Sequence, residues 1–344
     1  MEKNKFTYRD GVTIYLLAVL AAIAYQVVIA FVFEAFKATE LLSSVDWLST
    51  LVALPIQVIF FLTAFLYCRS KKTRFDLTPK PLKPLGYVLP IICAIGCLFL
   101  FYLAHISFAL LLDAMNYQSA GGIEFETVAG KIIGVIVTVF AAPIGEEIVF
   151  RGALLSGLKE KFKAPVAIVL SGLAFSLMHM NPEQTVYQFL LGCTCAYLTL
   201  QSGSLIPAII AHGTSNLIAC LMEIIEPFGS GFEFIVNWLI GVPWLFALLA
   251  VVLLATAVVG IYFLGKLLAR CKIEKAARTF TARPPIMKQQ SEEAVEVQSE
   301  SLLKKRNGNG AALYGIAIGA TAFMWAATFL VCIATGNGWL EGLI

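Results

Sequence analysis

The sequence predicts an all-α integral membrane protein, a polytopic helical bundle of about eight core spans with an additional C-terminal span. Hydrophobic residues make up 59% of the chain and charged residues only 14%, and the mean hydropathy is +0.83. Several apolar runs reach about 18 residues, the length with which a helix crosses about 30 Å of hydrocarbon. A soluble domain does not have this composition, and the runs lack the alternation of barrel strands. The net charge of +3 is too small to indicate a nucleic-acid partner.

Hydropathy along the chain predicts nine membrane spans. They lie at about residues 11–33, 47–68, 85–112, 131–157, 165–180, 185–200, 204–222, 244–264 and 311–333. The chain then divides into two N-terminal spans with a basic loop (1–80), a core (81–265), a charged linker (266–310) and an additional C-terminal helix with a tail (311–344). The mixed charge of the linker favours a solvated tether to the last span.

Lysine and arginine residues decide the predicted orientation in the membrane. They gather in the N-terminal segment, the loop 68–84, the loop 158–163 and the segment 265–310. With nine spans these four regions lie on one side, and basic loops usually face the cytoplasm. The loops 118–126 and 223–233 contain acidic residues but no Lys or Arg, and they lie on the other side. We therefore expect a multi-pass protein of the cell membrane with a cytoplasmic N-terminus.

Three charged residues, Glu146, Glu147 and Arg151, lie inside the fourth predicted span. An isolated charge at this depth costs about 2.5–3.5 kcal/mol on insertion scales. Glu147 and Arg151 are four residues apart, so they share a helix face and can form an ion pair. Glu146 is rotated from Glu147 by about 100°, and Phe150 occupies the position four residues after it. Pairing therefore explains one glutamate, and the other requires a reason outside its own helix.

The chain has three histidines, His105, His179 and His212. From a rise of about 1.5 Å per residue, Glu146 lies about 18 Å from the inner end of its span, His179 about 21 Å and His212 about 12 Å. Asn216 follows His212 by one helical turn. Polar residues from three spans thus lie at similar depth, which predicts one polar cavity that is open to water. His105 fits no such pattern, and we expect it to be a packing or interface residue.

A carboxylate beside two imidazoles and a carboxamide can hydrolyse a peptide bond. The carboxylate takes a proton from water, while the imidazoles orient this water, polarise the carbonyl or hold a metal ion that does both. The amide of Asn216 can donate to the developing oxyanion. Either His179 or His212 can then protonate the leaving amine.

Three of the predicted apolar spans, the fourth, fifth and seventh, contain motifs in a fixed order. The motifs are Glu146-Glu147-x3-Arg151, Phe175-x3-His179 and His212-x3-Asn216. They resemble those of the CPBP intramembrane proteases, a family that includes the type II CAAX prenyl endopeptidases, the Abi proteins and the lysostaphin-resistance-type proteins. The resemblance covers about residues 80–265, so the last span and its linker are an addition to the usual eight helices.

The resemblance implies a role for each motif residue. Glu146 would activate water, His179 and His212 would line the site, and Asn216 would help to form the oxyanion hole. The supporting residues would be Glu147, Arg151 and Phe175. Two mechanisms stay open: a divalent metal such as zinc, held by Glu146, His179 and His212, or a metal-free mechanism based on the glutamate. The chain contains no HExxH motif.

The predicted function is intramembrane endopeptidase activity on a peptide or protein substrate that has access to the membrane. Prenylated CAAX-type tails, bacteriocin precursors and membrane peptides are all candidates, and we expect them to enter from the cytoplasmic side or laterally from the bilayer. The alternative is a non-proteolytic membrane scaffold or bacteriocin-immunity factor, for which the extra span and linker would serve. A proton-coupled transporter is disfavoured because the sequence shows no paired repeats.

Overall fold

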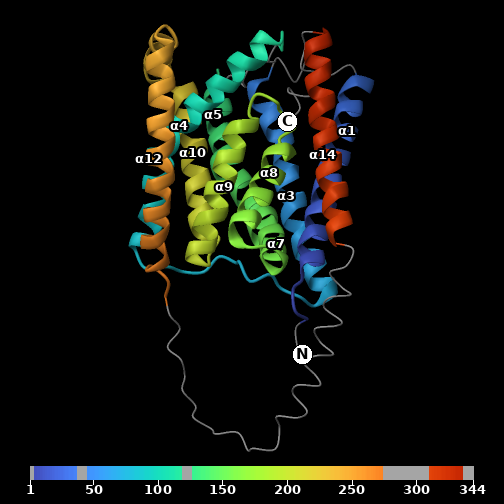
Figure 1. Cartoon of the computed structure of the whole chain (residues 1–344). Helices are drawn as coiled ribbons and strands as arrows, with labels where there is room; N and C mark the ends of the chain where they lie inside the picture. Colours follow the sequence, from blue (N-terminus) through green and yellow to red (C-terminus); the bar gives the residue numbers. More distant parts are fainter. Residues whose placement is uncertain (1–3, 37–44, 118–125, 274–309, 336–344) are drawn as a thin grey trace, which may run out of the picture.

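The computed structural model describes residues 4–36, 45–117, 126–273 and 310–335 of the chain, and Figure 1 shows their arrangement. Within these residues the secondary structure is helical, with three isolated bridges and no strand. The predicted all-α class is confirmed. The helices are α1 (Tyr8–Ala35), α3 (Asp46–Lys71), α4 (Leu85–Ala114), α5 (Val128–Val135), η1 (Ile136–Ala141), α6 (Ala142–Glu147), η2 (Ile148–Leu154), α7 (Leu155–Lys161), α8 (Ala164–Met178), α9 (Thr185–Ser202), α10 (Ile206–Ile224), α11 (Glu226–Ile240), α12 (Pro243–Ala269) and α14 (Gly310–Thr335).

In the described part of the chain, seven helical segments are long and apolar enough to cross a membrane. One of them is the continuous stretch from α5 to α7, which covers Val128–Lys161. The chain is therefore a multi-pass membrane protein. Each of the nine predicted spans has a helix at its place, but α8 and α9 are not among the seven. The 15 residues of α8 rise only about 22 Å, less than the thickness of the hydrocarbon.

Two predicted connections differ from the structure. The loop expected at 223–233 is wrong, because α11 begins at Glu226 and packs through Phe232 against the rings of Phe99 and Tyr102 on α4. The linker expected from residue 266 begins too early, because α12 continues to Ala269. Most of that linker and most of the predicted loop 118–126 lie outside the described residues.

The basic segments of the chain meet at one end of the bundle, the lower end in Figure 1. Isolated bridges join Asn4 to Thr73, Thr78 to Ser204 and Leu82 to Lys272. An ion pair of 3.4 Å joins Lys5 Nζ to Glu160 Oε2 at the same end. We call this the basic end; it comprises residues 4–9, 69–84, 158–163 and 266–273. The expected grouping of these basic segments on one side is thus present in the fold.

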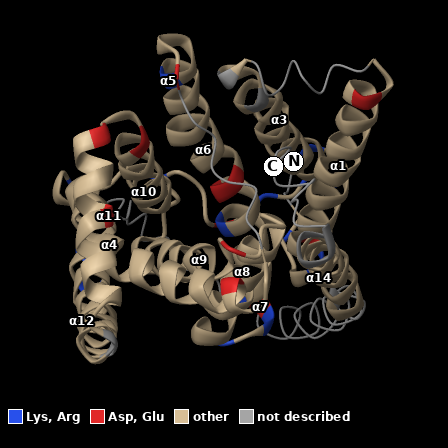
Figure 2. Ribbon diagram, turned by 90° about the horizontal axis from the view of Figure 1, so that it is seen from above, with Lys and Arg blue, Asp and Glu red and all other residues tan. Residues whose placement is uncertain are grey.

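The opposite end of the bundle is acidic. Figure 2, seen from above, shows Asp and Glu positions in red at several of the helix ends that face the viewer. We call this the acidic end; the described ionisable residues there include Glu34, Asp113, Glu126, Lys131, Glu223 and Glu226.

The helix with the two glutamates widens on both sides of them. Thr127 caps its start, since Thr127 Oγ1 accepts from the Gly130 N–H at 2.9 Å. The wide π-helical segments η1 and η2 lie before and after α6. In the wide register of η1 the carbonyl of Thr138 would accept from residue 143, but that residue is Pro143, which has no N–H. A carbonyl in the middle of the bundle is thereby left for a side chain of another helix.

The last helix, α14, packs against α1 and α8. Tyr314 Oη donates to the carbonyl of Leu170 at 2.7 Å, and Trp325 Nε1 donates to Thr185 Oγ1 at 2.7 Å. The additional span is therefore fixed against the turn between α8 and α9.

Candidate active site

A buried ion pair lies at the centre of the site. Arg151 Nη1 donates to Glu147 Oε1 at 2.7 Å, and both side chains are 0% exposed. Arg151 Nη2 donates to the carbonyl of Gly192 on α9 at 2.9 Å, and the guanidinium carbon lies 4.3 Å from the centre of the Phe175 ring. The structure thus contains the ion pair that the four-residue spacing predicts, and the pair ties the helix of residues 128–161 to α9.

The same carboxylate reaches a third helix. His212 Nδ1 lies 3.0 Å from Glu147 Oε1 and donates to it. A hydrogen bond from Nδ1 leaves Nε2 as the free nitrogen of the ring. Glu147 therefore fixes the orientation of the His212 imidazole with one of its oxygens.

Glu146 points in a different direction from Glu147 and is partly accessible, with 12% of its side chain exposed. Its Oε1 accepts from Gln57 Nε2 at 3.3 Å. Its Oε2 lies 3.9 Å from His212 Nε2 and has no hydrogen-bond partner among the described residues. Glu146 thus has one hydrogen-bonded oxygen, Oε1, and one oxygen without a hydrogen-bond partner among the described residues, Oε2.

His179 follows the last residue of α8 and is oriented by the main chain. Its Nδ1 donates to the carbonyl of Phe175 at 2.9 Å. The Phe175 ring lies edge-on to both imidazoles, with ring centres 4.8 Å from His179 and 5.5 Å from His212. The buried phenylalanine therefore packs against both histidines.

Asn216 supplies the donor that Pro143 lacks. Asn216 Nδ2 donates to the carbonyl of Thr138 at 2.8 Å. The two helices approach closely here because α10 carries Gly213, whose added Cβ would lie 2.9 Å from the carbonyl oxygen of Val139. A carboxamide nitrogen carries two hydrogens, so Asn216 keeps one N–H for another acceptor.

Four of the motif side chains line one cavity of about 430 Å³. The expected meeting of polar residues from separate helices at one depth is thus present in the structure. Phe175, Glu147 and Arg151 lie behind the cavity wall. The wall includes Glu146, His179, His212 and Asn216, together with Gln57, Tyr102, His105 and Gln188.

Residues 128–218, about a quarter of the chain, match the family model described as type II CAAX prenyl endopeptidase Rce1-like. This region, called the Rce1-like region below, is thus similar to that family. The match confirms the resemblance that the three motifs predict, and it contains all of their residues. Neither a curated protein nor a solved structure matches the chain. At the family level, the Rce1-like region supports an intramembrane CAAX-type protease, and such a protease implies a peptide or protein substrate.

Several cavity residues lie outside the Rce1-like region and were not assigned to the site from the sequence. His105, expected to be a packing or interface residue, is on the cavity wall, where its Nδ1 donates to the carbonyl of Glu183 at 3.1 Å. Gln57 of α3 contacts Glu146 directly. The signal that could have found both is a polar residue inside an apolar span, which usually faces the interior of the bundle.

The donor types at the site suit a metal ion, because Nε2 is the ring nitrogen left free on both His179 and His212 and Glu146 adds a carboxylate. The described residues nevertheless contain no group of three or more His, Cys, Asp or Glu side chains placed to hold a metal ion.

Proposed function

We propose that the protein is an intramembrane endopeptidase in which Glu146 activates the attacking water. The observation that supports this most is the buried Glu146 Oε2, unpaired among the described residues, which lies 3.9 Å from His212 Nε2 at the cavity wall. One water molecule can hydrogen-bond to both atoms at about 2.8 Å across a gap of this size. The family match of residues 128–218 supports the same reaction class.

In the proposed reaction, the water between Glu146 and His212 gives a proton to Glu146 Oε2 and its oxygen attacks the carbonyl carbon of the scissile bond. The second N–H of the Asn216 amide donates to the oxyanion that forms. The Glu146 carboxyl then passes its proton to the free Nε2 of His179, and His179 delivers it to the leaving nitrogen as the carbon–nitrogen bond breaks. The products are a carboxylic acid and an amine, and Glu146 is again ionised.

The donor types of the same residues would also suit a divalent metal such as zinc, although the described residues contain no group of three such side chains placed to hold one. When bound, it would be held by the Nε2 atoms of His179 and His212 and the carboxylate of Glu146, and it would polarise the carbonyl and the water.

For the orientation in the membrane, we propose that the basic end faces the cytoplasm. The loops of this end hold most of the Lys and Arg residues of the described chain, and basic loops remain on the cytoplasmic side during insertion. The N-terminal segment, which bridges to Thr73 at this end, is then cytoplasmic.

Replacing His179 by alanine tests the proposed activity. In proteoliposomes supplied with a peptide mixture, we expect kcat/KM to fall by about 10²- to 10⁴-fold, as followed by mass spectrometry of the products. His105→Ala is the matched control, because this histidine lines the same cavity but contacts none of the four proposed catalytic side chains, and we expect a smaller loss. Cleavage by His179→Ala at the parental rate would rule out the proposed site.

Replacing Gln57 by leucine tests the support of Glu146. Leucine keeps the size of the side chain but removes the donor to Glu146 Oε1, so the carboxylate can rotate away from the water. We expect kcat to fall by about 10- to 100-fold with little change in KM. Thr50→Val, on the same helix and the same cavity wall, should retain the parental kcat. Equal kcat values for the two variants would show that Gln57 does not position Glu146.

A further inference from the structure

The cavity opens toward the acidic end of the bundle. α10 runs from the basic end, where Ser204 bridges to Thr78, to the acidic end at Ile224. Of the wall residues that α10 contributes, the first two, His212 and Ser215, are buried, whereas those nearer the acidic end are accessible: Asn216 and Met222 are partly exposed and Ala219 is exposed. The mouth of the cavity therefore lies beyond Asn216, on the side of the acidic end.

The short α8–α9 hairpin explains this opening. α8 starts near the basic end, and its 15 residues carry the chain only about 22 Å. The turn that follows, with His179 and Gln184, therefore stops below the tips of the longer helices, as Figure 1 shows for α8 and α9 beside α12 and α14. The wall residue Gln184 at this turn is exposed.

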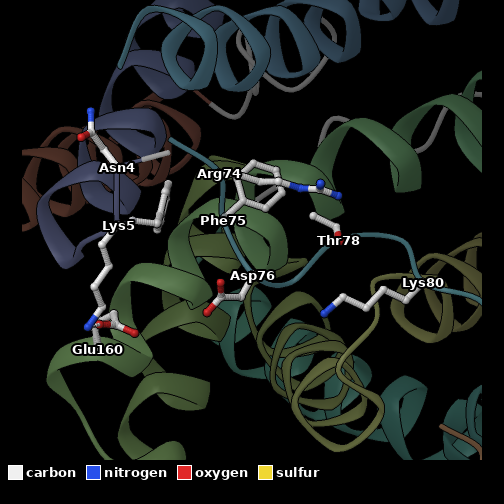
Figure 3. Close-up of a pocket in the computed structure, with 9 residues that line it drawn as sticks. Asn4, Lys5, Arg74, Phe75, Asp76, Thr78, Lys80 and Glu160 are labelled. Atoms are coloured by element: carbon white, nitrogen blue, oxygen red, sulfur yellow. Dashed lines mark ion pairs between the residues drawn. The ribbon is translucent and has the colours of Figure 1, made fainter. Parts of the chain in front are cut away.

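The opposite direction is closed. Between the ion pair and the basic end, Leu154, Leu205, Ala208 and Ala211 are all buried, with at most 1% exposed. The basic end has a separate hollow of about 460 Å³, lined by residues such as Lys5, Arg74 and Lys80 (Figure 3). None of the four proposed catalytic residues lines this hollow. A substrate at the basic end thus meets a packed layer and no passage to Glu146.

We infer that the active-site cavity is entered from the extracytoplasmic side of the membrane and takes peptide segments exposed there. The inference combines the direction of the cavity with the proposed cytoplasmic basic end, and it rests on the proposed peptidase activity for the nature of the substrate. It differs from the expectation that substrates enter from the cytoplasmic side or laterally from the bilayer. A prenylated cytoplasmic tail does not reach this mouth, whereas a secreted peptide or the outer part of a membrane-inserted chain does.

Cysteine labelling tests the inference. Gln184→Cys reports on the cavity mouth, and Lys80→Cys reports on the exposed surface of the basic end. In sealed right-side-out vesicles, a membrane-impermeant maleimide is expected to label Gln184→Cys and not Lys80→Cys, and permeabilisation should make both react. The parent protein, whose native cysteines are retained in both variants, gives the background to subtract.

Labelling of Lys80→Cys alone in the sealed vesicles, or equal labelling of both variants there, would overturn the inference. The readout does not depend on catalysis, so the two proposals fail separately. A protein that labels as expected but cleaves no peptide from either side contradicts only the peptidase activity. A protein that cleaves an unprenylated reporter peptide only from the side of Lys80 contradicts only the direction of entry.

Discussion

Replacing Glu146 by glutamine is expected to reduce peptide cleavage by about 10²- to 10⁴-fold, the contribution of a positioned general base, while the protein folds and inserts normally. Glutamine has the size of glutamate and can still contact Gln57, but its amide cannot take a proton from water. The side chain is partly exposed to the cavity, so the change leaves no buried charge without a partner. Initial rates in proteoliposomes, with the melting temperature measured on the same preparation, check both parts.

Glu147→Gln is the matched control, because it makes the same chemical change one residue away. Glu147 is fully buried and bonded to Arg151 and His212, so its neutralisation leaves a buried guanidinium without its counter-charge. We expect the melting temperature of Glu147→Gln to fall, whereas Glu146→Gln should melt like the parent. Parental cleavage by Glu146→Gln would remove this carboxylate from the mechanism.

Replacing Arg151 by methionine is expected to destabilise the protein by about 3–5 kcal/mol, the usual effect of removing one partner of a buried pair. Methionine fills part of the volume, but Glu147 keeps its charge in the interior and the carbonyl of Gly192 loses its donor. The contact with the Phe175 ring is also weakened. Thermal unfolding in a mild detergent, followed by aggregation or by fluorescence, measures the effect.

Lys159→Met is the control for Arg151→Met, since it removes a cation from an exposed pair. Lys159 Nζ lies 3.2 Å from Asp76 Oδ2, and the Asp76 side chain is 67% exposed. Exposed pairs contribute about 0–1 kcal/mol, so this variant should unfold close to the parental temperature. If Arg151→Met were as stable as Lys159→Met, the buried pair would not be the structural centre of the site.

Much of the fold follows from composition and hydropathy alone. The lipid core requires apolar helices, and the nine predicted spans each have a helix in the structure, although α8 is too short to cross the hydrocarbon. The Glu147–Arg151 pair also follows from the sequence, because both partners belong to one helix and their spacing fixes their mutual direction. The predictions were weaker where a segment was neither long nor uniformly apolar, as in α11 with its glycines and glutamates.

The parts of the site that were not predicted depend on contacts between distant segments. Gln57 is 89 residues from Glu146, and nothing in a single sequence indicates that their helices are neighbours. His105 was judged by the absence of a motif and not by its depth in the membrane. The wide turn η1 also changes the direction of the side chains that follow it, so a regular period of 3.6 residues cannot locate Glu146 relative to α3.

One oxygen atom, Glu147 Oε1, accepts from Arg151 and from His212, and through Arg151 it is linked to the backbone of α9. Three helices are thereby held at fixed distances by a group that touches no substrate. Dipoles fixed in advance need little rearrangement as charge develops during a reaction. In water, solvent molecules must reorient toward the oxyanion during each reaction, which costs free energy. In the protein this ordering takes place once, when the chain folds.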